Sequence, residues 1–180
     1  MRTIKFRGRD NQGEWHYGYL VIRLGITYIF EEIWEYYRDS YVKTDKFKEI
    51  EVSADTVGQF IELYDKNGKE IYEGDIIRYT DIEEFCVNPD CDLHLQFSQT
   101  YACVKEDVVI FKNGMFTLTN DNYIRPLCYY GFDDLENLRI CSGVKDDENE
   151  DINGTIIDNS LLGLKVIGNI HDNPELLEEK

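Results

Sequence analysis

The cysteines and the histidine within residues 86–103 are the sharpest candidates for chemistry in this sequence. Cys86 and Cys91 are separated by four residues, His94 follows after two more, and Cys103 lies nine residues further on. Thiolate and imidazole are ligands that tetrahedral zinc prefers, and residues 88–90 could form a turn that presents them. The paired Cys-x-x-Cys spacing is absent, however, and alternating apolar residues in this segment also predict a plain hairpin. We therefore expect unligated side chains and no cofactor, with zinc as the alternative.

Two carboxylates flank a glycine at Glu73-Gly74-Asp75. Residues two apart in a strand share a face, so this pair could perturb each other's ionisation, as catalytic acid pairs do. A tight turn explains the same residues more simply, because Gly supplies the conformation and Asp accepts backbone hydrogen bonds. The three histidines lie in no nucleophile or metal signature, and the sequence has no Gly-rich phosphate loop. We therefore expect a turn here and no catalytic residue.

The first 15 residues carry a small basic and aromatic cluster that could contact nucleic acid. Against this stands a net charge of −17, from 36 acidic and 19 basic residues, which repels phosphate. Lys and Arg facing outward on a strand also commonly protect a sheet edge. Nucleic-acid binding is therefore one alternative function, and mimicry of DNA by the acidic surface is another. The cluster consists of Arg2, Lys5, Phe6, Arg7, Arg9 and Trp15.

Short β-like segments separated by turn residues must position these side chains. Asn-Gly pairs at residues 67–68 and 113–114 each separate two β-prone segments, which is the strongest local signal for a hairpin. Residues 26–37 read as a strand with a polar interruption at residues 31–32, and a short helix is the alternative for this segment. Residues 164–170 also read as a strand, and residues 173–177 predict a helical turn with Pro at its first position.

Alternation in residues 15–22 separates two sets of side chains. We expect the first set to form an aromatic face, and His16, which lies opposite that face with the rest of the second set, to be solvated or packed at an edge. The first set is Trp15, Tyr17, Tyr19 and Val21, and the second is His16, Gly18 and Leu20.

These segments predict an all-β fold with minor helix. We expect an N-terminal β subdomain over residues 1–55 and a small SH3-like β-barrel over residues 56–180, packed as one unit. Residues 81–100 read as an inserted loop, and residues 143–154 as an acidic loop. The hydrophobic content of 42% supplies a core, and the aromatic content of 13% suits strands.

Cysteine usage and hydropathy indicate the cellular compartment. The five cysteines are odd in number and form no closely spaced framework, so we expect reduced thiols. Charged residues interrupt any apolar run at the start, and no stretch approaches the length that a membrane-spanning helix requires. A cytoplasmic protein without membrane contact follows as the expectation.

Three blocks of sequence, in order along the chain, resemble the signature of YopX-like proteins of bacteriophages and prophages. The resemblance implies a small β protein from a phage or an integrated element, with no enzymatic activity attached to it. The cysteine-bearing segment 86–103 is not part of the motif. The blocks are residues 1–8 (Met-Arg-Thr-Ile-Lys-Phe-Arg-Gly), residues 56–60 (Thr-Val-Gly-Gln-Phe) with 65–78 (Asp-Lys-Asn-Gly-Lys-Glu-Ile-Tyr-Glu-Gly-Asp-Ile-Ile-Arg), and residues 166–177 (Val-Ile-Gly-Asn-Ile-His-Asp-Asn-Pro-Glu-Leu-Leu).

The leading functional hypothesis is a phage accessory protein that binds another protein without catalysis. Tyr36, Tyr37, Tyr129 and Tyr130 would suit a protein interface or self-association if they are exposed, and would be core residues if they are not. The enzyme hypothesis is the weakest of those considered.

Overall fold

The structure is a computed structural model that describes residues 4–86, 98–119, 126–130 and 163–178. These residues form β-strands and short 3-10 helical turns, and none of them lies in an α-helix. The elements are β1 (Phe6–Arg9), β2 (Trp15–Arg23), β3 (Ile26–Tyr37), β4 (Ser40–Glu51), η1 (Ala54–Thr56), β5 (Gly58–Tyr64), β6 (Glu70–Tyr72), β7 (Asp75–Cys86), β8 (Ser98–Lys112), β9 (Met115–Leu118), η2 (Leu127–Tyr130), β10 (Lys165–Asn169) and η4 (Pro174–Leu177).

The chain divides into two compact units. The first comprises Met1–Leu63 and Glu70–Gly74, and the second comprises Tyr64–Lys69 and Asp75–Lys180. Strands β5 and β6, which we expected in the second subdomain, belong to the sheet of the first unit.

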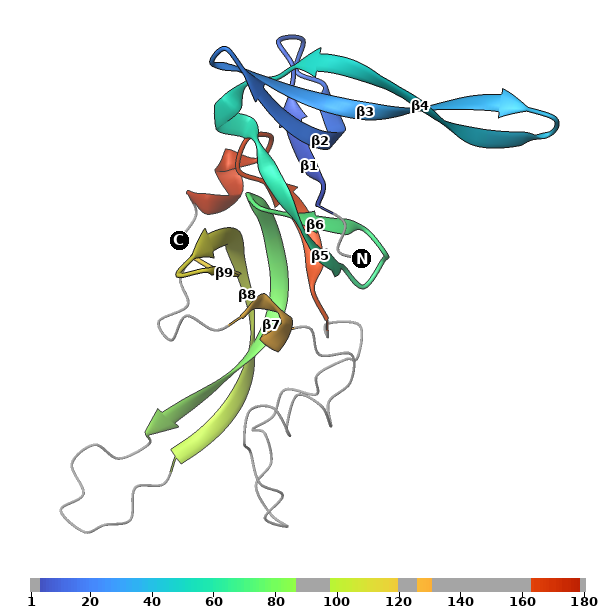
Figure 1. Cartoon of the computed structure of the whole chain (residues 1–180). Helices are drawn as coiled ribbons and strands as arrows, with labels where there is room; N and C mark the ends of the chain where they lie inside the picture. The colour runs from blue at the N-terminus through green and yellow to red at the C-terminus, as the bar shows by residue number, and fades with distance from the viewer. Residues whose placement is uncertain (1–3, 87–97, 120–125, 131–162, 179–180) are drawn as a thin grey trace. The chain divides into compact units, whose positions relative to one another are not determined.

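The first unit is built on a six-stranded antiparallel sheet with the order β4-β3-β2-β1-β5-β6. Strand β2 pairs with β3 only between Tyr19 and Arg23, whereas β3 pairs with β4 as far as Tyr37. The outer part of β3 and β4 therefore extends beyond the sheet as a two-stranded ribbon (Figure 1). We call residues 33–46 the ribbon. The buried hydrophobic residues of this unit are Ile29, Val52, Phe60, Ile61, Ile71 and Tyr72.

Two-residue turns join the long strands of the first unit. Leu24 and Gly25 connect β2 to β3, and both have positive φ, which is the geometry of a type I′ turn. Arg38 and Asp39 connect β3 to β4 with φ of 49° and 64°. This tip has no glycine, and Arg38 adopts the left-handed region against its side-chain preference, whereas Asp tolerates that region better.

The second unit contains a four-stranded antiparallel sheet with the order β10-β7-β8-β9. Strands β7 and β8 pair from Ile76–Val108 out to Cys86–Ser98 as one long hairpin. Asn113 and Gly114 form the β8–β9 turn with φ of 53° and 82°, so this predicted hairpin is confirmed. The buried hydrophobic residues are Ile76, Ile77, Tyr79, Val108, Val109, Leu118, Leu127, Tyr130, Leu164 and Val166.

The turn after β5 is held by the carboxylate of Asp65. Asp65 is 6% exposed, and it accepts hydrogen bonds from the backbone N–H groups of Asn67 (2.8 Å), Lys69 (2.9 Å) and Val166 (3.2 Å). Burial by itself would raise the pKa of Asp65, but the three N–H groups together lower it below the usual value. Only Gly68 of the Asn-Gly pair has positive φ, so the turn is not a type I′ turn. The side chain of Asp65 stabilises it by accepting hydrogen bonds from the backbone.

The all-β class is confirmed, but the expected SH3-like barrel is not found among the described residues, where both sheets are open. The expected loop over residues 81–100 is wrong at both ends, because 81–86 and 98–100 continue the β7–β8 ladder. Residues 87–97 and the expected acidic loop at 143–154 lie outside the described part. The predicted closing strand is confirmed as β10, and the predicted helical turn as the 3-10 turn η4.

Candidate protein-interaction surface

The register of the first sheet sorts its side chains onto two faces. Tyr19 pairs with Phe30, and Glu32 pairs with Phe47. Because side chains alternate along a strand, odd-numbered residues of β2 and even-numbered residues of β3 share one face. We call this the aromatic face. Its rings are Trp15, Tyr17, Tyr19, Tyr28, Phe30, Trp34, Tyr36, Tyr41 and Phe47.

The opposite face of this sheet is the buried one. Ile29 is fully buried there, and Thr27 is 7% exposed. Gly18 is also buried, and a Cβ added to it would lie 2.1 Å from the carbonyl oxygen of Phe30, so no larger residue fits. The rings on the aromatic face take the exposed position instead.

Ring-to-ring contacts run across the aromatic face. The ring of Tyr17 meets Tyr72 edge-on with centroids 5.6 Å apart, and Tyr19 meets Phe47 at 5.8 Å. On the ribbon, Tyr36 and Tyr41 are directly opposite each other and their rings form a T-shaped pair at 5.2 Å. Such pairs stabilise a sheet through side chains alone, which matters where only two strands are present.

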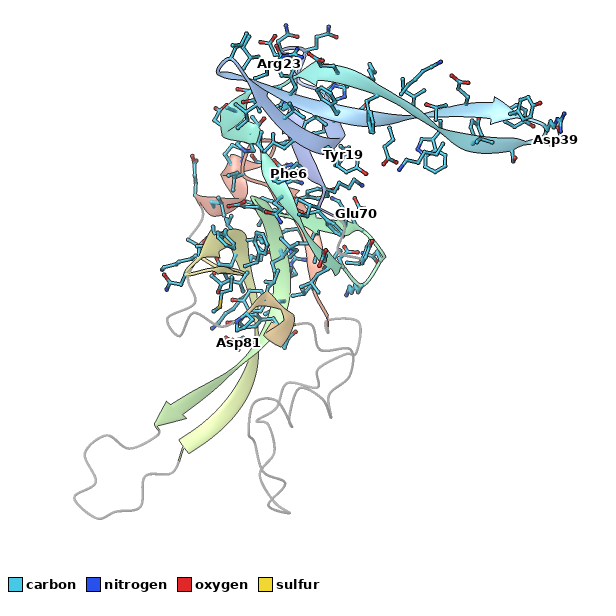
Figure 2. The ribbon with its side chains drawn as sticks, in the orientation of Figure 1. Phe6, Tyr19, Arg23, Asp39, Glu70 and Asp81 are labelled. Atoms are coloured by element: carbon cyan, nitrogen blue, oxygen red, sulfur yellow. The ribbon has the colours of Figure 1, made fainter. Side chains whose placement is uncertain are left out.

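The ribbon exposes most of its aromatic surface. Tyr36 and Tyr41 are 63% and 71% exposed, and Trp34 is 54% exposed. On the other side of the ribbon, Tyr37 is also exposed (Figure 2 marks the tip at Asp39). A two-stranded hairpin is marginally stable in water and gains little from rings that contact solvent. Exposed aromatic side chains of this number are typical of a surface that binds another molecule.

Hydrogen bonds fix the base of the ribbon. Glu32 accepts from the ammonium of Lys43 and from the hydroxyl of Tyr19 (2.8 Å). These two donors hold the pKa of Glu32 below its usual range, so it remains an anion at neutral pH. Further out, Lys46 lies 3.6 Å from Glu35.

Cations lie over the rings at the other end of the aromatic face. The guanidinium of Arg7 sits 4.9 Å from the centroid of Trp15 and 5.0 Å from that of Tyr72. Arg7 is 5% exposed and also donates a hydrogen bond to the carbonyl oxygen of Glu73 at 3.1 Å. Lys5 lies over Tyr17 at 5.7 Å. These are cation–π contacts, and the buried one at Arg7 is the strongest type.

The residues of the predicted basic cluster make these contacts and further ones within the protein. Lys5 donates to Glu70 at 2.7 Å, and Glu70 also accepts the hydroxyl of Tyr72 at 2.6 Å. Burial and this hydrogen bond to Glu70 raise the pKa of Tyr72. Arg9 donates to the carbonyl oxygen of Gly13 at 2.9 Å. Lys5, Arg7 and Arg9 are therefore engaged within the protein, while Arg2 lies outside the described residues.

His16 is held between two carboxylates. Its Nδ1 lies 3.0 Å from Glu31 Oε1, and its Nε2 lies 3.1 Å from Asp10 Oδ2, with the ring 14% exposed. Each ring nitrogen of His16 therefore faces one carboxylate oxygen. Asp10 also accepts the backbone N–H groups of Glu14 and Gln12, which together with His16 lower its pKa. This arrangement ties the β1–β2 turn to β3.

The strand register separates two of the candidate zinc ligands. Cys86 pairs with Ser98, and Cys103 pairs with Asp81, so the two cysteines lie five residues apart along the ladder. That is about 17 Å, whereas thiolates on one zinc ion lie within about 4 Å of each other. One ion cannot hold both. Cys91 and His94 lie outside the described residues, so a site formed with Cys86 stays a prediction.

The Glu73-Gly74-Asp75 corner is a turn, as expected. Gly74 has a φ of 83°, which favours glycine. The backbone of Glu73 bonds within the first unit, where its N–H donates to the carbonyl oxygen of Gln59 at 2.9 Å. Asp75 is 1% exposed and begins β7, opposite Asn169. Within the described part of the chain, no group of three or more metal-binding side chains is present.

The closing block of the sequence motif contains a turn between β10 and η4. The side-chain oxygen of Asn169 accepts the N–H groups of His171 and Asp172 at 2.9 and 3.0 Å. A Cβ added to Gly168 would lie 2.6 Å from the side-chain oxygen of Asn173, so the glycine permits a close approach. These residues, like Asp65, serve the fold.

Two of the tyrosines that we expected at an interface are confirmed as exposed, Tyr36 and Tyr37. Tyr130 is a core residue with 1% exposure, and its ring packs edge-on against Tyr79 at 4.8 Å. The side chain of Tyr129 is outside the described part. Trp34, Tyr41 and Phe47 were not predicted as surface residues, although aromatics in a segment rich in Lys and Glu are the signal that could have identified them.

Comparisons with known proteins agree with the motifs. Residues 5–178 match a family model described as YopX protein. The solved structure of protein EF1440 from Enterococcus faecalis is similar, with 18% identity, coverage of 99% of this chain and 100% of that chain, and a TM-score of 0.43. No curated protein matches. Within the described residues, no helix has the length and hydrophobicity needed to cross a membrane.

Proposed function

The chain belongs to the YopX family, and we propose that it is a non-catalytic protein-interaction module, an accessory protein of a phage or prophage, that binds its partner through the ribbon. The observation that carries this proposal is the exposure of Trp34, Tyr36 and Tyr41 on one face of a projecting hairpin. Aromatic side chains bury large areas at low cost in conformational entropy, which is why they dominate protein interfaces.

The geometry of the ribbon supports binding rather than packing within the unit. Beyond Glu32, strand β3 has only β4 as a neighbour in the sheet. The cross-strand pair of Tyr36 and Tyr41 stabilises the hairpin from within. The rings are therefore held in place before a partner arrives, and this reduces the entropic cost of binding.

Nucleic-acid binding is the weaker candidate. The cations expected to contact phosphate are engaged by Glu70, by Trp15 and Tyr72, and by the carbonyl oxygen of Gly13. The net charge of −17 adds long-range repulsion.

Site-specific photo-crosslinking tests the proposal. A benzophenone-bearing phenylalanine analogue replaces Tyr36 in one variant and Phe111 in the other, and each is irradiated in lysate of the host bacterium. Phe111 is a matched control because it is 56% exposed on a hairpin of the other unit. We expect discrete higher-mass adducts from position 36 and none from position 111. Adducts only at position 111, or none at either position, would contradict the proposal.

A further inference from the structure

The aromatic face already shows which groups its rings bind. Besides Arg7 between Trp15 and Tyr72, the guanidinium of Arg23 lies 5.2 Å from the ring centroid of Tyr28. Lys5 over Tyr17 adds an ammonium to the two guanidinium groups. Within one sheet, the same contact between a Tyr or Trp ring and a cation therefore recurs.

The pattern stops at the ribbon. Among the described residues, no cation lies over the rings of Trp34, Tyr36 or Tyr41. The cations of the ribbon itself are engaged elsewhere, since Lys43 bonds to Glu32 and Lys46 pairs with Glu35. Arg38 lies over Tyr37, on the opposite side of the ribbon. Three rings on the aromatic face are thus accessible to a cation from another molecule.

The net charge of the protein indicates what kind of molecule could supply this cation. Residues of the first unit include nine Lys and Arg against 13 Asp and Glu, a net charge of −4, and the second unit has 10 against 23, a net charge of −13. A second copy carries the same −17 and is repelled at long range, as nucleic acid is. The ribbon itself is neutral, with three Lys and Arg against three Asp and Glu, so a basic partner is attracted by the net charge of the whole protein.

We infer that the ribbon binds a basic, arginine-rich segment of a partner protein, whose guanidinium groups stack on Trp34, Tyr36 and Tyr41. This inference rests on the proposed function and specifies the chemistry of the occupant. Arginine suits the site better than lysine, because its planar group stacks on a ring and is less strongly hydrated.

Titration of the full chain with nona-arginine tests the inference, with nona-lysine, nona-glutamate and a dodecamer of thymidylate as comparison probes. The triple variant Trp34→Ala, Tyr36→Ala, Tyr41→Ala leaves the net charge unchanged, so it separates ring stacking from general charge attraction. Phe111→Ala controls for loss of an exposed ring elsewhere. Calorimetry gives the affinities, circular dichroism checks folding, and gel filtration gives the oligomeric state.

We expect nona-arginine to bind the triple variant about tenfold more weakly than wild type, and Phe111→Ala to match wild type. Nona-lysine should lose less from the triple substitution. Equal affinity of wild type and triple variant for nona-arginine would overturn the inference. So would tighter binding of the thymidylate dodecamer at the ribbon, or a dimer that the triple variant abolishes. If crosslinks form at position 36 but the triple substitution does not change the affinity for nona-arginine, the ribbon binds a partner that is not basic. If no crosslinks form and the affinity is also unchanged, the proposed function is contradicted as well.

Discussion

The tips of two hairpins, one in each unit, have the same design with different residues. In each, an aromatic pair lies directly opposite across the strands, Tyr36 with Tyr41 and Phe111 with Phe116. Each pair is followed by one further residue on either strand and a two-residue turn with positive φ. The turn is Asn113-Gly114 in the second unit, whereas the ribbon has Arg38-Asp39.

The two turns differ in how well their residues suit the left-handed backbone, and therefore in how much each turn stabilises its hairpin. Asn and Gly adopt the left-handed region at little cost, whereas a long side chain such as Arg pays about 1 kcal/mol or more. The tip of the β8–β9 hairpin is therefore optimal for its turn, and the tip of the ribbon is not. Backbone strain that the fold does not require is typical of binding sites, which agrees with the proposed role of the ribbon.

Exchanging the two turns gives the largest expected effect. Replacing Asn113-Gly114 by Arg-Asp should lower the free energy of unfolding by roughly 2 kcal/mol, because Arg tolerates the left-handed region less well than Asn and Asp adds a Cβ where Gly has none. The reciprocal change, Arg38→Asn with Asp39→Gly, should raise it by roughly 1 kcal/mol. Urea denaturation measures both. If both exchanges changed the free energy of unfolding by the same amount in the same direction, the two turns would not be comparable.

The two tips also show what the sequence reveals and what it hides. Asn113-Gly114 predicts a hairpin because both residues tolerate the backbone that the turn requires. Arg38-Asp39 carries no such signal, and residues 40–51 have polar side chains on both faces, so no alternation predicts strand β4. The ribbon is exposed because its strands lack a third neighbour, and that depends on pairing between distant segments.

The architecture escaped prediction for the same reason. Local patterns identify β5 and β10 as strands, but the pairing of β1 with β5 and of β10 with β7 joins segments about 50 to 90 residues apart. Pairing at such separations decides between an open sheet and a closed barrel, and period-two alternation does not encode it. The motif residue Asp65 was correctly placed in a turn, yet its bond to Val166 is visible only in the structure.

The Asp65 turn extends the comparison with a third solution, in which a buried carboxylate supplements the turn residues Asn67-Gly68. Asp65→Asn should cost about 1–2 kcal/mol at pH 7, because one amide nitrogen would face a backbone donor. The pKa of Asp65 is lowered in the folded state, so its contribution is complete above the unfolded value near 3.9 and is lost as pH falls through the folded value. The difference between wild type and Asp65→Asn should therefore shrink below pH 4 in thermal denaturation.

A control for this pH dependence is Asp39→Asn at the tip of the ribbon. Asp39 is exposed and accepts only a long hydrogen bond from Tyr36, at 3.4 Å, among the bonds described for it. Asn tolerates the left-handed region as well as Asp does. The stability of this variant should follow that of wild type at every pH, and a shrinking difference here would mean that the effect is not specific to Asp65.

The smallest expected effect concerns the aromatic pairs themselves. A double-mutant cycle of Tyr36→Ala and Tyr41→Ala should give a coupling energy of about 0.5–1 kcal/mol, and the cycle of Phe111→Ala and Phe116→Ala a similar value. Their centroids are 5.2 and 5.1 Å apart, so the geometry of the two pairs is nearly equal. If the pairs contribute equally to folding but only the first affects crosslinking at the ribbon, the aromatic side chains have two separable roles. A T-shaped contact leaves the outer ring face open, so Tyr36 and Tyr41 can stabilise the hairpin and still bind a cation. A coupling energy well above that of the phenylalanine pair would instead indicate that the rings of the ribbon serve mainly to stabilise the hairpin.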